Sequence, residues 1–414
     1  DVSVTNSGNI VALSRYNTAL GVYAFSTYGD VSVDHSDGYM RVGTISDTAI
    51  GIAAASQYGD VSVNADGDIS AYSFNGNASG MQLQTGYGDI TVTGSGNMLV
   101  NSPGSAVGIS AASGYGSIDI THDGSIQVGS SNGNATGISA YTYDADISVG
   151  GVGNISASTT NGNATGIYAG SYNFGNVSVD VGGDISASTY VGNAAGIFAY
   201  SFGGDVSVTS AGGISATTTY GSAVGIRANS VLGKYGVNVD NSGNINVASY
   251  SGYAFGINAS GKYADVVNSG DITANSTYGT ALGIYSSGKY DSVINNSGDV
   301  TASSLGRAFG LFGRSNYGYS TVTNSGTISV DSQYSFAAGI VNVGIYGGLV
   351  DSTGDINANS TYGAAFGIYG VGLYGNSTVV SGGDINATSY TNNAMGIFNY
   401  SLYSSIIDNS GNIN

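Results

Sequence analysis

The chain has 414 residues and a formal net charge of −18, with 69 Gly, 32 Tyr, one Pro and no Cys or Trp. All 26 acidic residues are Asp and only eight residues are basic, which argues against binding the phosphate backbone of a nucleic acid. A hydrophobic fraction of 41% separates the chain from a disordered Gly/Ser tract. Strand-forming residues outnumber helix formers, so we expect a folded, all-β protein.

The chain is built from repeats of about 29 residues. The glycine of an A-x-G-[IVLM] motif recurs fourteen times from Gly21 to Gly396, in steps of 27 to 31 residues. A second glycine, in S-G-[ND]-I and its variants, precedes it by 12 or 13 residues each time. Two landmarks that stay in phase over fourteen copies indicate true internal repetition.

Each repeat contains three short segments in which apolar and polar residues alternate, as in strands with one buried face. In chain order these are D-V-S-V (such as residues 30–33), G-D-I-S-A (such as residues 67–71) and A-x-G-I-x-A (such as residues 223–228). In the third segment, simple alternation predicts that the residues flanking Gly225, Val224 and Ile226, share the buried face with Ala228. Gly, Asn, Ser and Tyr-Gly separate the segments, which is typical of turns.

Three strands per repeat, without helical connections, fit neither a propeller blade nor a leucine-rich repeat. We predict an all-β fold, a right-handed parallel β-helix (β-solenoid) of about fourteen coils. Residues 1–414 are expected to form one continuous array, uncapped at both ends, and a rod on the order of 70 Å long. Such an array is either part of a longer one or stacks end to end.

The strings TVTNSGTISV (residues 321–330) and GNATGIYA (residues 162–169) resemble repeats in the passenger regions of bacterial autotransporters and in filamentous-haemagglutinin-like adhesins. The resemblance covers essentially the whole chain and implies an extended β-solenoid surface protein. It implies a stalk or fibre more than any particular activity. The outer-membrane barrel and N-terminal secretion domain of that family are not part of this sequence.

Aspartates recur at equivalent turns and would form columns in a solenoid. Stacked like charges repel, so either water screens them or a cation bridges them, and calcium is the candidate outside a cell. No complete calcium-binding loop motif is present. The candidate metal ligands are Asp30, Asp60, Asp89, Asp271, Asp299, Asp355 and Asp384.

Asparagine and tyrosine also recur at fixed places. Asn241, Asn268, Asn296 and Asn324 occupy one position in successive repeats, which predicts a ladder of stacked amides. Two further sets predict aromatic columns that either pack as ladders or present a glycan- or surface-binding stripe: Tyr28, Tyr58, Tyr87 and Tyr115, and Tyr220, Tyr278 and Tyr362. The two histidines, His35 and His122, lie at different distances from their glycines, so we expect them in different columns and not at a metal site.

The alanine and glycine of A-x-G are present in every repeat. With simple alternation both point away from the core and leave a bare strip for lateral packing against a second chain. The alternative is a bend at glycine that places alanine in a tight corner. The candidate interface residues are Ala164, Gly166, Ala194, Gly196, Ala223, Gly225, Ala254 and Gly256.

These features predict a structural fibre or adhesin stalk, outside the cell or on its surface, that mediates attachment and self-associates. Cell-surface glycans are candidate ligands, and no catalytic residue, cofactor or membrane span is expected in this segment. The alternative is a polysaccharide-binding or polysaccharide-degrading β-helix. No repeat has an insertion long enough to build the walls of a catalytic cleft, which favours the structural function.

Overall fold

The computed structural model describes residues 1–414 and consists of strands joined by short turns. The chain forms two compact units, Asp1–Gly212 and Gly213–Asn414. Each unit is a stack of coils in which every strand pairs in parallel with its counterpart one coil away. The predicted parallel β-solenoid of about fourteen coils is therefore confirmed, whereas one continuous array over residues 1–414 stays a prediction.

Each coil contributes a first, a second and a third strand, corresponding to the three predicted segments. The first strands of the first unit are β1 (Val2–Asn6), β4 (Val31–His35), β7 (Val61–Ala65), β10 (Ile90–Gly94), β13 (Ile118–His122), β16 (Ile147–Val152), β19 (Val177–Val181) and β22 (Val206–Ser210). The second strands are β2 (Ile10–Ser14), β5 (Tyr39–Thr44), β8 (Asp68–Ser73), β11 (Met98–Ser102), β14 (Ile126–Ser130), β17 (Ile155–Asn161) and β20 (Ile185–Val191). The third strands are β3 (Ala19–Ser26), β6 (Ala49–Ser56), β9 (Ala78–Thr85), β12 (Ala106–Ser113), β15 (Ala135–Thr142), β18 (Ala164–Ser171) and β21 (Ala194–Ser201).

The second unit repeats this order. Its first strands are β25 (Val237–Asn241), β32 (Tyr319–Asn324), β35 (Gly347–Ser352), β38 (Ser377–Ser381) and β41 (Ser405–Asn409). Its second strands are β23 (Ile214–Tyr220), β26 (Ile245–Ser249), β28 (Ile272–Ser276), β30 (Val300–Ser304), β33 (Ile328–Ser332), β36 (Ile356–Ser360) and β39 (Ile385–Ser389). Its third strands are β24 (Ala223–Ser230), β31 (Ala308–Ser315), β34 (Ala337–Gly344), β37 (Ala365–Gly372) and β40 (Ala394–Ser401).

Two strands of the second unit are longer than predicted. β27 (Ala254–Asn268) and β29 (Ala281–Asn296) each join a third strand to the first strand of the next coil without an interruption. The A-x-G glycine steps 256 to 283 and 283 to 310 are both 27 residues, the shortest in the chain. These repeats therefore lack the extra turn residues that separate the two strands elsewhere.

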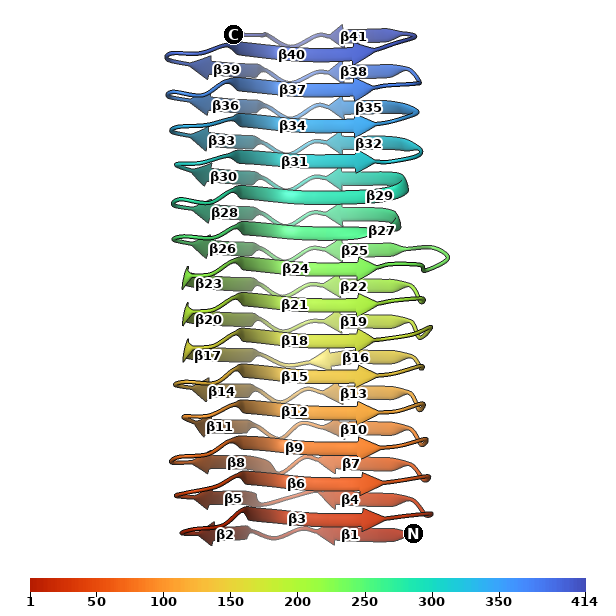
Figure 1. Cartoon of the computed structure of the whole chain (residues 1–414), viewed down its shortest axis with the longest axis vertical. Coiled ribbons are helices and arrows are strands. Elements are labelled where there is room, and N and C mark those ends of the chain that lie inside the picture. Colours follow the sequence, from red (N-terminus) through yellow and green to blue (C-terminus); the bar gives the residue numbers. More distant parts are fainter. The chain divides into compact units, whose positions relative to one another are not determined.

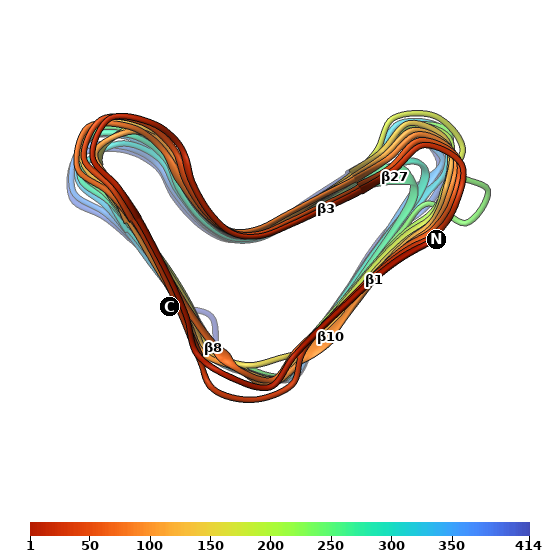
Figure 2. The same cartoon turned by 90° about the horizontal axis from the view of Figure 1, so that it is seen from below.

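The winding of the chain is right-handed within each unit, as predicted. In Figure 1 the third strands cross the front from left to right, and the first and second strands return behind them while the chain climbs. Figure 2 looks along the stack and shows that one coil encloses a core, with the third strand opposite the first and second. The chain bends inward on the side of the third strand, so the outer surface of that side is concave.

The core consists of columns of aliphatic side chains. Val61 and Val63 of a first strand, Ile126 of a second strand and Ile138 of a third strand are all fully buried. Because the pairing is in register, equivalent side chains of successive coils pack on each other. Ile138 of β15, for example, lies beside Ile167 of β18. Burial of each aliphatic side chain contributes about 1.5–3 kcal/mol, so the core is the main source of stability.

The third strand does not alternate simply, and that part of the prediction was wrong. Gly225 and Ile226 are both buried, whereas Val224 is half-buried on the outer side. Register pairing skips the glycines, since Val224 pairs with Phe255 and the next pair is Ile226 with Ile257. The strand thus bends at the glycine and places two successive residues inside.

The bend explains why glycine recurs there. A Cβ atom on Gly166 would lie 2.3 Å from Cγ2 of Ile185 and 2.6 Å from the carbonyl oxygen of Gly196. Both distances are shorter than real Cβ contacts. The position accordingly excludes even the smallest side chain.

We therefore predict that Gly166→Ala destabilises the protein by about 1–3 kcal/mol or more through overpacking. The matched control is Gly182→Ala, because nothing lies within 4 Å of a Cβ atom at Gly182. Chemical denaturation measures both. A Gly166→Ala variant as stable as the control would contradict this account of the bend.

Candidate functional site

The predicted lateral interface is wrong, because its residues are buried within the chain itself. All four of its alanines are at most 1% exposed: Ala164, Ala194, Ala223 and Ala254. The glycines between them are buried as well: Gly166, Gly196, Gly225 and Gly256. The physical reason is the bend at glycine, which turns both residues toward the core, as the alternative prediction had it.

The aspartates predicted as metal ligands form hydrogen-bonded ladders with the backbone. The amide N–H of Asp60 donates to Oδ1 of Asp30 at 2.9 Å, and that of Asp89 donates to Oδ1 of Asp60 at 2.8 Å. In the second unit Asp299 donates in the same way to Asp271 at 3.0 Å, and Asp384 to Asp355 at 2.9 Å. These bonds satisfy a turn N–H of each coil and explain why an Asx side chain recurs there.

The ladders do not require a charge. Asn176 takes the same place and accepts the N–H of Asp205 at 2.9 Å, and Asn244 accepts that of Asp271 at 2.9 Å. The described residues contain no cluster of three or more His, Cys, Asp or Glu arranged to hold a metal ion. Calcium binding by these columns stays a prediction, which a variant with Asn in place of Asp can test.

The predicted asparagine ladder is confirmed. The side-chain amide of Asn241 donates to Oδ1 of Asn268 at 2.7 Å, Asn268 donates to Asn296 at 2.8 Å, and Asn296 donates to Asn324 at 2.8 Å. Each amide also donates to the carbonyl of the glycine two residues later, at 2.7 Å. All four side chains are buried, so the ladder is an internal stabilising element and not a binding surface.

The two histidines lie in one column, contrary to expectation. His35 pairs with Asn6 of the preceding coil and with Ala65 of the following coil. His122 lies three coils after His35 and pairs with Gly94 of the coil before it. The column of a residue is set by strand register. The two histidines lie at different distances from the next glycine because the turns after their strands differ in length. Both rings are completely buried.

Burial lowers the pKa of His122, and the Gly96 carbonyl, Asp123 and Asp66 oppose that shift only in part. The folded state therefore favours the neutral imidazole. A buried histidine that is held neutral makes the stability of the folded state depend on pH.

The tyrosine columns lie on the surface. Tyr28, Tyr58, Tyr87 and Tyr115 stack with ring centroids 5.5, 5.3 and 5.3 Å apart and with interplanar angles of 14° or less. Their ring faces cover one another, so the edges and hydroxyls face the solvent. In the second unit, Tyr278 meets Tyr250 edge-on at 5.1 Å and Tyr362 stacks on Tyr334 at 5.6 Å. A glycan-binding role for these columns stays a prediction.

The outer side of the third strands is a surface that the sequence analysis missed. None of the fourteen eight-residue segments that begin at the alanine of A-x-G contains Asp, although the chain has 26. We call this surface the carboxylate-free face. In the second unit it carries half-buried aromatic rings in mutual contact, with Phe309 5.7 Å from Phe312 and Tyr369 4.9 Å from Phe398. It also carries Arg314, which is exposed.

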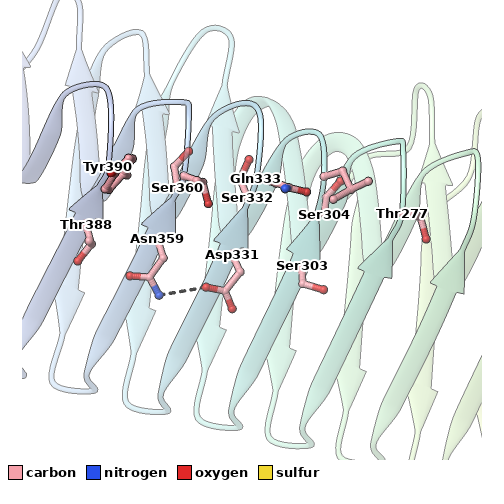
Figure 3. A pocket seen from close by; sticks show the side chains of 12 residues that line it. Thr277, Ser303, Ser304, Asp331, Ser332, Gln333, Asn359, Ser360, Thr388 and Tyr390 are labelled. Atoms are coloured by element: carbon pink, nitrogen blue, oxygen red, sulfur yellow. Dashed lines mark hydrogen bonds between the residues drawn. The ribbon is translucent and has the colours of Figure 1, made fainter.

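A groove runs over the second strands of the second unit and has a volume of about 720 Å³ (Figure 3). Its floor is a row of outward side chains in register, Ser303 of β30, Asp331 of β33, Asn359 of β36 and Thr388 of β39. Asn359 donates its amide to Oδ1 of Asp331 at 3.0 Å. We call this feature the polar groove.

The side of the polar groove is formed by the turns that follow the same strands. Inward hydroxyls fix these turns, since Ser304 donates to the carbonyl of Gly279 at 2.8 Å and Ser360 to that of Ser335 at 2.7 Å. Gln333 lies on this side, and Tyr390 lies at one end with 83% of its surface exposed (Figure 3). The groove is therefore a concave surface whose turns are held by hydrogen bonds and whose floor carries the exposed side chains of Asp331, Asn359 and Thr388, with Leu305 also in the lining.

The ladder account predicts that Asp60→Asn retains full stability, because Asn keeps the Oδ1 acceptor for the Asp89 N–H. Asp60→Ala should lose about 1 kcal/mol. Unfolding midpoints in millimolar calcium and in EDTA should be equal for the natural chain and for Asp60→Asn. A midpoint that calcium raises in the natural chain alone would contradict the ladder account and support a bridging ion.

Asn268→Ala should destabilise the protein by roughly 2 kcal/mol or more, because it leaves Oδ1 of Asn296 buried without a donor and removes the acceptor of Asn241. Asn246→Ala is the control, since Asn246 points outward and is exposed. Equal denaturation midpoints for the two variants would show that the ladder contributes nothing.

The stability of the protein should fall as pH drops below about 6.5, the usual pKa of histidine. The unfolded chain then takes up a proton that the folded state resists, because burial lowers the pKa of His122 in the folded state. His122→Asn should remove this part of the pH dependence, which unfolding midpoints at about pH 7.5 and about pH 5 measure. An unchanged pH dependence in the variant would contradict the assignment.

The structure contains no helix with the length and apolarity needed to cross a membrane. Comparison of the chain with known proteins finds no matching family model, no matching curated protein and no matching solved structure. The β-solenoid fold therefore stands on the structure itself, and function has to be argued from the surfaces described above.

Proposed function

We propose that the chain is a structural, extracellular β-solenoid that acts as an adhesive scaffold, similar to the passenger regions of autotransporters and to filamentous-haemagglutinin-like adhesins. The observation that supports this most is the uniformity of the coils. Every repeat follows one plan within 27 to 31 residues, so the chain presents rows of side chains at regular spacing rather than a single specialised site.

The polar groove supports binding over catalysis. Glycoside hydrolases of the usual kind use a pair of carboxylates that flank the scissile bond. The polar groove contains a single one, Asp331. Polysaccharide degradation therefore ranks behind attachment as a function for this chain.

Self-association is the second part of the proposal, through the carboxylate-free face instead of the buried alanines. A net charge of −18 makes copies of the chain repel each other over most of their surface. The carboxylate-free face adds no negative charge to a contact, and it offers half-buried aromatic rings such as Phe312 and Phe366. Association through it would bury these rings and exclude water from them.

Beads coated with the chain test both parts. They should cluster with one another and attach to cell or matrix surfaces more strongly than beads coated with an unrelated acidic protein. Phe312→Asp should reduce clustering at least several-fold because it places a carboxylate on the carboxylate-free face. Thr301→Asp, on an exposed position of β30, is the matched control.

Beads that neither cluster nor attach would contradict the proposal. So would the release of reducing ends when the chain is incubated with polysaccharides, because turnover would indicate an enzyme. Loss of clustering in both variants alike would contradict the role of the carboxylate-free face.

A further inference from the structure

The polar groove has the composition of a site for a hydroxyl-rich ligand. Its floor presents a carboxylate at Asp331, an amide at Asn359 and a hydroxyl at Thr388. The hydroxyl of Ser303, in the same row, donates to Oδ1 of Asn275 at 2.8 Å. These groups offer both donors and acceptors, which an apolar or purely cationic ligand could not satisfy. Asp331, Asn359 and Thr388 are all exposed, so a ligand can reach them without unfolding the turns.

The ladder geometry favours a ligand that is itself a linear repeat. The floor residues belong to successive coils that pair in register. The side chains of neighbouring coils are therefore about 4.8 Å apart along the stack. Figure 3 shows the two rows of lining side chains running side by side from Thr277 to Tyr390. Those residues span five second strands, β28 to β39, which gives a groove roughly 19 Å long.

The negative charge of the groove and of the chain limits which ligands can bind. Asp331 is the one ionisable carboxylate in the groove, and the chain as a whole is strongly acidic. An anionic polymer would be repelled by both. An uncharged ligand can donate hydroxyl hydrogen bonds to the free oxygen of Asp331, because its Oδ1 already accepts from Asn359.

The groove also carries apolar surface beside its polar groups. Leu305 and the exposed ring of Tyr390 both line it. An exposed ring beside polar groups is suited to a ligand with one apolar and one polar face. Sugar rings have that character.

We propose that the polar groove binds a linear, uncharged polysaccharide, whose sugar units follow the successive coils and pack on the apolar surface of Leu305 and Tyr390. This inference rests on the proposed role in attachment and names the chemistry of one partner. A groove of this length accommodates several sugar units, so affinity should rise with chain length and then level off.

The test uses the full chain with neutral linear oligosaccharides, cello-, manno- and malto-oligosaccharides from disaccharides to octasaccharides, measured by calorimetry. At least one series should bind, with affinity that increases with length and levels off within the series. Tyr390→Ala and Asn359→Leu should each weaken binding about tenfold, a loss of about 1.4 kcal/mol. Tyr317→Ala is the control, since Tyr317 is also exposed, at 60%, and does not line the groove.

Equal unfolding midpoints of the variants and the natural chain confirm that they fold. Oligogalacturonides and chitosan oligosaccharides form the charged arms, and preferential binding of either would overturn the assignment to a neutral ligand. No binding in any neutral series, or binding that both groove variants retain in full, would overturn the site. Attachment of coated beads in that case would leave the scaffold function intact, so the two proposals fail separately.

Discussion

The pairing of each coil with the next, in register and in parallel, is the constraint on which the other features depend. It places Ile138 beside Ile167 in the core and Asn268 beside Asn296 in the ladder. A side chain that fits its column then stabilises the contacts with the coil before and the coil after it. A side chain that does not fit weakens both contacts. This explains why the same few residue types recur at the same places over fourteen repeats.

The same constraint determines how much amino-acid substitution each position of a coil tolerates. Inside, a glycine at each bend and an aliphatic residue beside it leave no room for change, as the contacts of Gly166 demonstrate. At the turns, an Asx side chain is needed to accept one N–H, but Asp and Asn serve equally. On the outer faces the residue type varies from coil to coil. Specific binding can therefore arise there without cost to the core.

The repeats, the strand types, the coil number and the asparagine ladder could all be predicted from the sequence, because each is a periodic signal that recurs at the same place in successive coils. The burial of Ala164 and Gly166 could not, since simple alternation does not reveal that the strand bends at the glycine. The shared column of His35 and His122 was missed because register, and not distance to a glycine, assigns columns. The polar groove was missed because its floor residues differ in type: Ser303, Asp331, Asn359 and Thr388 give no repeated letter.

The central claim, that equivalent residues lie above one another in register, can be measured directly. The chain has no cysteine, so spin labels can be attached at Thr273 and Asn386 alone after substitution by cysteine. Register pairing links these positions through Thr301, Ser329 and Asn357, four coil steps in all. Pulsed electron paramagnetic resonance should give a narrow distance distribution near 19 Å, from four spacings of about 4.8 Å. A broad distribution, or one centred beyond about twice that length, would contradict in-register stacking.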